Sequence, residues 1–142
     1  MFKQIDETIS VAPQIDTQAV AAAAAQGIKL IINNRPDGES DGQIEGAAIE
    51  AAARAAGLDY TAIPVTHAGF SAWQVEAMRT ALDDASGPVL AYCRSGTRST
   101  LLWALAQASK GEHAAVLQEK AAQAGYDLSP ITQMMDVLRQ QK

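Results

Sequence analysis

Short apolar runs alternate with longer helix-like segments through the first two thirds of the chain, and this alternation limits the fold more than any other feature. The runs read TISVAPQ (8–14), IKLIINN (28–34), DYTAIPV (59–65) and VLAYC (89–93). Apolar runs of about four to eight residues between turn-forming residues are typical of buried strands. Because helices that connect such strands cover both faces of a parallel sheet, the sequence predicts an α/β fold with a mostly parallel central sheet of about four strands.

Cap signals bound the helices between these strands. Asp16 or Thr17 can cap an alanine-rich helix, and Gly27 fits the position after its last turn. Ser71 can likewise cap a helix in which Trp73 is an expected core anchor. Beyond the fourth strand and its loop the pattern becomes wholly helical, so we expect a helical C-terminal third.

Composition and charge exclude several classes of function. The 142 residues fit one domain, and the formal net charge of −5 argues against nucleic acid or an anionic membrane as a partner. The start MFKQIDETIS lacks the pattern of a signal peptide, and no apolar stretch is long enough to span a bilayer, so we expect a cytoplasmic protein. A single cysteine excludes an internal disulfide and leaves no second thiol for a zinc site, so no metal or cofactor is expected.

The only cysteine, Cys93, ends the fourth predicted strand just before a polar loop and a helix. A lone cysteine is most often a small buried hydrophobic residue, but the unpaired N–H groups and dipole of a helix N-terminus favour a thiolate. Gly96 allows a loop whose N–H groups point inward, and Arg98 can hold a tetrahedral anion through two parallel hydrogen bonds. The sequence therefore predicts that Cys93 is a nucleophile and that Arg98 binds the anion beside it.

The remaining residues of the loop complete this predicted anion site. Ser99 is expected to donate a hydrogen bond to the thiolate or to cap the helix, and Arg94 is expected to point outward and steer an anionic donor. The predicted anion-binding loop consists of Arg94, Ser95, Gly96, Thr97 and Ser99.

These segments resemble known proteins. CRSGTRS (93–99) resembles the active-site loop of rhodanese-type sulfurtransferases and, more loosely, that of cysteine-dependent phosphatases. IINNRPDGE (31–39), AGLDYTAIPV (56–65) and GPVLAYCRSGTRSTLLWALAQA (87–108) together resemble the beta-lactamase-hydrolase-like (BLH) family over about residues 3–110. The resemblance implies a dual-specificity-phosphatase-like fold. Since some members are fused to metallo-beta-lactamase-like persulfide dioxygenase domains, it also implies a persulfide dioxygenase as a candidate partner.

The spacing within the loop favours sulfur over phosphorus. Cysteine phosphatases carry five residues between Cys and Arg, whereas four residues separate Cys93 from Arg98 here, as in the rhodanese pattern. Tyr92 also stands where the phosphatase pattern has His. A smaller ring of N–H groups suits a persulfide better than a phosphoryl group. We therefore predict a sulfurtransferase that takes a sulfane sulfur from a small anionic donor such as thiosulfate and passes it to a thiol.

Two more loops are expected at the same edge of the sheet. Dual-specificity phosphatases place an acidic residue after the third strand, but this chain reads THAG there, so His67 is either a general acid or a solvated loop residue. Asp37 or Asp41 is a weaker candidate acid, because acidic residues in such loops usually form turns. Arg35 either adds a second positive charge to the site or pairs with Asp37 or Glu39.

Two alternatives to the sulfurtransferase stay open. A phosphatase of the tyrosine or dual-specificity type would use the same cysteine on a phosphorylated substrate, through a phosphocysteine. A non-catalytic module would bind an anion or persulfide and act through a partner protein, with the helical tail as its docking surface.

Overall fold

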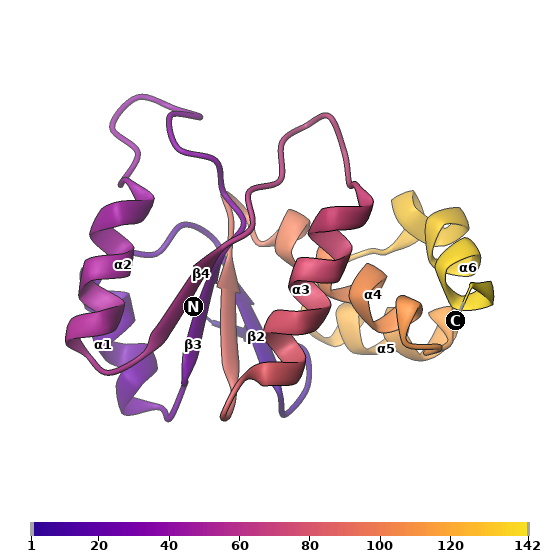
Figure 1. Cartoon of the computed structure of the whole chain (residues 1–142), viewed down its shortest axis with the longest axis horizontal. Coiled ribbons are helices and arrows are strands. Elements are labelled where there is room, and N and C mark those ends of the chain that lie inside the picture. The colour runs from indigo at the N-terminus through magenta and orange to yellow at the C-terminus, as the bar shows by residue number, and fades with distance from the viewer. Residues whose placement is uncertain (1, 142) are drawn as a thin grey trace.

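The computed structural model describes residues 2–141, which fold around a five-stranded sheet of order β1-β2-β5-β3-β4 (Figure 1). The strands are β1 (Lys3–Gln4), β2 (Ile9–Ala12), β3 (Leu30–Asn33), β4 (Asp59–Ala62) and β5 (Val89–Tyr92). The helices are α1 (Thr17–Ala25), α2 (Gly46–Ala55), α3 (Ala72–Asp84), α4 (Thr97–Ser109), α5 (Ala114–Gln123) and α6 (Thr132–Gln140), with the 3-10 turn η1 (Ser129–Ile131) before α6.

Four of the strands run parallel, so they all end at the same edge of the sheet. Val89 of the central strand β5 is paired with Ile9 on one side and Leu30 on the other. The predicted α/β fold and its four parallel strands are confirmed. The prediction missed β1, which is antiparallel to β2, because Lys3 and Gln4 are both exposed and carry no apolar pattern.

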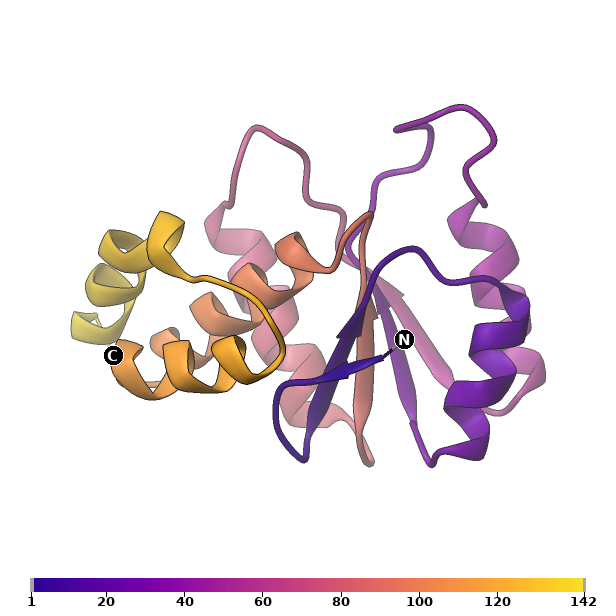
Figure 2. The same cartoon turned by 180° about the vertical axis from the view of Figure 1, so that it is seen from behind.

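Helices cover both faces of the sheet, as predicted. Figures 1 and 2 show α1 and α2 on one face and α3 to α6 on the other. On the first face Ile31, Ile49 and Leu90 belong to one apolar cluster. On the second face Ile32 and Leu102 belong to a larger cluster. The larger cluster packs α4 directly against the sheet.

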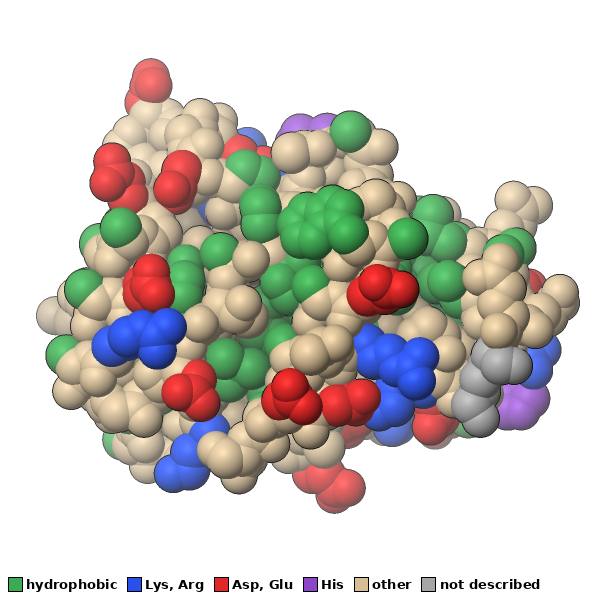
Figure 3. Space-filling model, viewed as in Figure 1, with side chains coloured by type: hydrophobic (Ala, Val, Ile, Leu, Met, Phe, Trp, Pro, Cys, Tyr) green, Lys and Arg blue, Asp and Glu red, His purple; other side chains and the backbone are tan. Residues whose placement is uncertain are grey.

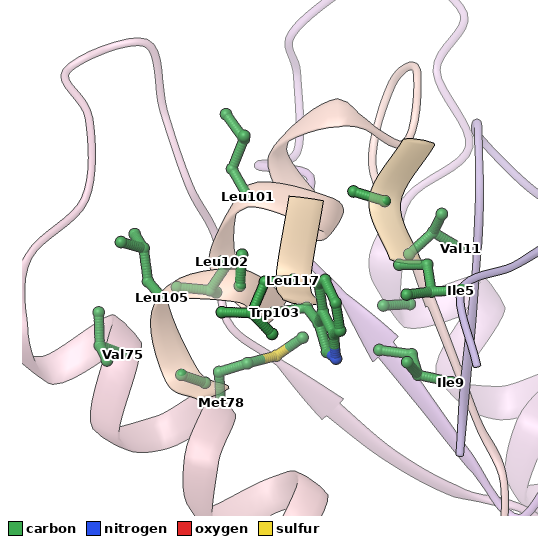
Figure 4. Packing of buried hydrophobic residues seen from close by; sticks show 14 of the residues in the cluster. Ile5, Ile9, Val11, Val75, Met78, Leu101, Leu102, Trp103, Leu105 and Leu117 are labelled. Carbon is green, nitrogen blue, oxygen red and sulfur yellow. The ribbon is translucent and has the colours of Figure 1, made fainter. Parts of the chain in front are cut away.

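Helix α4 is the central helix of the second layer. Nine of its residues are buried, and it packs against α3, α5 and α6. Figure 4 shows its apolar side chains meeting those of α3, β2 and α5. Each fully buried Leu contributes about 1.5–3 kcal/mol, so the position of this helix is strongly fixed. Among residues 2–141 no helix is long and apolar enough to cross a membrane.

The helix caps follow the sequence prediction, but one core anchor does not. Asp16 accepts a hydrogen bond from the Ala19 N–H at 2.8 Å, and Gln74 accepts one from the Ser71 N–H at 2.8 Å in a capping box. The prediction that Trp73 is a core residue was wrong: it is 54% exposed beside a groove of about 500 Å³ between α3 and β4. Figure 3 shows apolar side chains gathered on this face.

Candidate active site

Cys93 lies directly after β5, and the loop that follows curls over its sulfur. The Gly96 N–H donates a hydrogen bond to Cys93 Sγ at 3.1 Å, and Gly96 is also the N-cap of α4. The φ angle of Gly96 is +91°, a region that residues with a Cβ rarely adopt. A Cβ at Gly96 would also collide with the hydroxyl of Tyr126. The glycine therefore allows the loop to close around the sulfur.

The Arg98 guanidinium joins the three loops that leave the carboxyl edge of the sheet. Its Nη1 and Nη2 donate to the two carboxylate oxygens of Glu39 at 2.6 and 2.8 Å, and Nη1 also donates to the Val65 carbonyl at 2.6 Å. Glu39 belongs to the loop after β3 and Val65 to the loop after β4, which Figure 1 shows rising from the same edge. The three loops therefore meet at one point beside Cys93.

The charges around Arg98 favour its cationic form. The pKa of Arg98 lies above its ordinary value, chiefly because its guanidinium donates to Glu39, and the Cys93 sulfur adds to the effect. The same hydrogen bonds from Arg98, with further help from Arg35, lower the pKa of Glu39 to about 2. Glu39 is therefore ionised at neutral pH and holds Arg98 in place as a fixed counter-ion.

Arg35 pairs with Glu39 rather than with Asp37. Its Nε donates to Glu39 Oε1 at 3.0 Å, its Nη1 to Gln14 Oε1 at 3.0 Å, and its side chain is only 6% exposed. Asp37 is exposed and accepts a hydrogen bond from the Gly46 N–H at 2.8 Å, at the start of α2. The structure thus gives Asp37 a cap-like role at a helix N-terminus and does not bring its carboxylate to Cys93.

Ser99 was expected to bind the thiolate or to cap the helix, but Gly96 is the N-cap and the Ser99 hydroxyl donates to another partner. Ser99 lies within the first turn of α4, and its Oγ donates to Asn34 Oδ1 at 2.8 Å. Asn34 in turn donates through Nδ2 to the Ile63 carbonyl at 2.9 Å, and both Ser99 and Asn34 are fully buried. These bonds join α4 to the residues that follow β3 and β4, so Ser99 ties the first turn of α4 to that edge of the sheet.

The outer part of the loop after Cys93 faces solvent and is contacted by a residue of the C-terminal region. Arg94, Ser95 and Thr97 are exposed, and Ser95 Oγ donates to Thr97 Oγ1 at 3.0 Å. The hydroxyl of Tyr126, from the segment after α5, donates to the Ser95 carbonyl at 3.0 Å. The pKa of Tyr126 lies above its ordinary value, chiefly because the ring is partly buried and also because of the Cys93 sulfur.

His67 stands apart from this network. It is exposed on the loop between β4 and α3, and within residues 2–141 no hydrogen bond joins its ring to Cys93 or Arg98. The described part of the chain also has no group of three His, Cys, Asp or Glu side chains able to hold a metal ion.

Four residues of the site were missed in these roles by sequence reasoning. Glu39 was not expected to bind Arg98. Asn34 had a detectable signal, because an amide at the end of a buried apolar strand must find hydrogen-bond partners. Gln14 and Tyr126 had none, since each reaches the site from a distant part of the chain.

Comparison with known proteins identifies the family. The model of the phosphatase-like domain of beta-lactamase hydrolase-like proteins matches residues 1–111. The chain belongs to this family. A "Beta-lactamase hydrolase-like protein" of Agrobacterium fabrum is 34% identical over 134 residues, which are 94% of this chain but 31% of that protein. The chain thus spans about a third of this BLH relative.

Solved structures share the fold. A candidate phosphatase from Neisseria meningitidis is 35% identical, with a TM-score of 0.83 and 96% of each chain covered. P. aeruginosa TpbA, solved in complex with pTyr, is 20% identical with a TM-score of 0.64 over 94% of this chain and 85% of that chain. At this identity TpbA shows the fold alone. The BLH chain therefore has the cysteine-phosphatase fold that the resemblance implied.

Proposed function

We propose that this BLH chain is a cysteine-dependent phosphatase that acts on aryl phosphomonoesters. One observation carries the proposal: the Gly96 N–H lies 3.1 Å from Cys93 Sγ at the start of α4, with the Arg98 guanidinium held beside it. A sulfur nucleophile, inward N–H groups and a guanidinium are what phosphoryl transfer through a thiol requires. The phosphatase-like family and the Neisseria relative support this reading over the sulfurtransferase predicted from loop spacing.

The reaction would proceed in two displacements. The Cys93 thiolate attacks phosphorus, a P–S bond forms as the P–O bond to the aryl group breaks, and the aryl oxygen leaves as phenolate, which takes a proton from water. Water then attacks the phosphocysteine, which releases inorganic phosphate and restores the thiolate. Loop N–H groups and Arg98 stabilise the charge on the three equatorial oxygens in both steps.

The substrate class follows from the missing acid. The loop after Val65 carries no carboxylate in THAG, and His67 is exposed without a contact to Cys93. A phenol, with a pKa near 10 as in tyrosine, leaves with far less need of a proton than an alkyl alcohol does. Aryl phosphates are therefore the proposed substrates, and the pTyr bound in the TpbA structure belongs to this class.

A rapid-quench experiment tests the proposed intermediate. The protein is mixed with an excess of p-nitrophenyl phosphate, quenched in acid within milliseconds and weighed intact. The wild type should gain one phosphoryl group, and Cys93→Ser, which replaces the only cysteine, should gain none. Release of nitrophenol at equal rates by both proteins would contradict the proposal.

A second candidate function, the sulfurtransferase, keeps support from the loop itself. Only four residues separate Cys93 from Arg98, and a persulfide needs no general acid, because sulfite departs from thiosulfate without a proton. In that case Cys93 would gain one sulfur from thiosulfate, and a persulfide dioxygenase would be a fitting partner. The same mass measurement after incubation with thiosulfate distinguishes the two, since a sulfur and a phosphoryl group differ in mass.

A further inference from the structure

A groove of about 380 Å³ lies over the segment that joins β2 to α1. Five of the eight residues that line it are apolar: Pro13, Ile15, Ala19, Ala22 and Ile44. The polar ones are Gln14, Asp16 and Gln18. Ile15 and Ala19 are buried, whereas Pro13 is exposed, so the groove has an apolar floor and an open side.

Gln14 belongs both to this groove and to the active site. It lines the groove, its N–H donates to the Arg94 carbonyl at 3.4 Å, and its Oε1 accepts from Arg35 at 3.0 Å. The Cys93 N–H donates to the carbonyl of Ala12, the residue just before the groove-lining segment, at 3.4 Å. Gln14 therefore connects the wall of the groove to the loop after Cys93 and to Arg35.

We propose that this groove binds the organic part of the substrate, an apolar aromatic group, while its phosphoryl group lies over Cys93. This inference rests on the proposed phosphatase function. The apolar walls match an aromatic ring, which is also the leaving group that a site without an acidic residue in THAG can release. Ala22 is half-buried in α1, so its size sets how much of the ring the groove accepts.

Filling the groove from α1 tests the inference. Ala22→Leu adds an apolar side chain and keeps good helix propensity, and Ala21→Leu is the matched control, since Ala21 is an exposed neighbour that does not line the groove. Wild type and Ala21→Leu should prefer 2-naphthyl phosphate over phenyl phosphate by about tenfold in kcat/KM, and Ala22→Leu should lose most of this preference. An equal preference for 2-naphthyl phosphate in all three proteins, or no such preference in the wild type, would overturn the groove proposal.

A second measurement does not depend on turnover. Cys93 is the only cysteine, so its alkylation by iodoacetamide and by N-benzyl iodoacetamide can be followed by intact mass. The benzyl reagent should react relatively faster with wild type and Ala21→Leu than with Ala22→Leu. If the ratio of the two alkylation rates is lower in Ala22→Leu while no aryl phosphate is hydrolysed, the groove proposal is supported and the phosphatase proposal is contradicted. If phenyl phosphate is hydrolysed and the ratio does not change, the groove proposal fails alone.

Discussion

Gly96 lies in the loop after Cys93, and replacing it with alanine should destabilise the protein in two separable ways. A Cβ at φ +91° costs about 1–2 kcal/mol, because it crowds the backbone. The Cβ would also collide with the Tyr126 hydroxyl and lie 3.0 Å from Tyr126 Cζ. The ring must therefore move, which sacrifices its hydrogen bond to the Ser95 carbonyl, worth about 0.5–1.5 kcal/mol. Gly96→Ala should thus lower the free energy of unfolding by about 1.5–3.5 kcal/mol.

A double-mutant cycle separates the two contributions. Tyr126→Phe removes the colliding hydroxyl and the hydrogen bond together, so Gly96→Ala in that background should cost little more than the backbone strain, about 1–2 kcal/mol. Urea unfolding of the four proteins measures the coupling, which should be about 0.5–1.5 kcal/mol. Additive effects would refute the claim that Tyr126 clamps the loop at Gly96.

Three further predictions concern the network around the site. The pKa of Glu39 is lowered from 4.5 to about 2, so the stability that its ionised form adds is complete above pH 4.5 and is lost as the pH falls toward 2. The difference in unfolding free energy between wild type and Glu39→Gln should therefore be largest near pH 7 and shrink between pH 4.5 and pH 2. Ser99→Ala leaves the buried Asn34 Oδ1 without its donor and should cost about 1–3 kcal/mol in urea unfolding; a cost near zero would contradict this role. Asp37→Ala should lower stability by about 1 kcal/mol but leave aryl phosphate hydrolysis unchanged, since its carboxylate accepts a hydrogen bond from the Gly46 N–H at the start of α2. A large loss of kcat would restore it as a candidate acid.

The parts of the site that were predictable from sequence are those that depend on neighbouring residues. The apolar run that ends at Cys93, the glycine that permits a positive φ and the arginine in the first turn of the next helix all lie within a few residues. Backbone preferences and helix-end electrostatics act over that range, so the order of residues was enough to place the loop.

The rest depends on contacts between distant segments. Glu39 reaches Arg98 across 59 positions, and Tyr126 reaches Ser95 across 31, and no local pattern marks either pair. The prediction that Trp73 is buried was wrong for a related reason. The burial of an aromatic residue near a helix start depends on what packs over it, and β4 is the edge strand of the sheet, so Trp73 beside it stays exposed. The choice between sulfur and phosphorus follows the same division. The loop length is a local signal and favours sulfur, whereas the family and fold of the whole chain favour phosphorus.

The most direct test compares two reactions of one protein sample side by side: hydrolysis of p-nitrophenyl phosphate, and transfer of sulfur from thiosulfate to cyanide. Phosphate release by the wild type, abolished in Cys93→Ser and faster than any thiocyanate formation, is the predicted result. Thiocyanate formation that needs Cys93, without phosphate release, would contradict the phosphatase and establish the sulfurtransferase in its place. Neither reaction, from a folded protein that binds phosphate or thiosulfate, would contradict both and leave an anion-binding module.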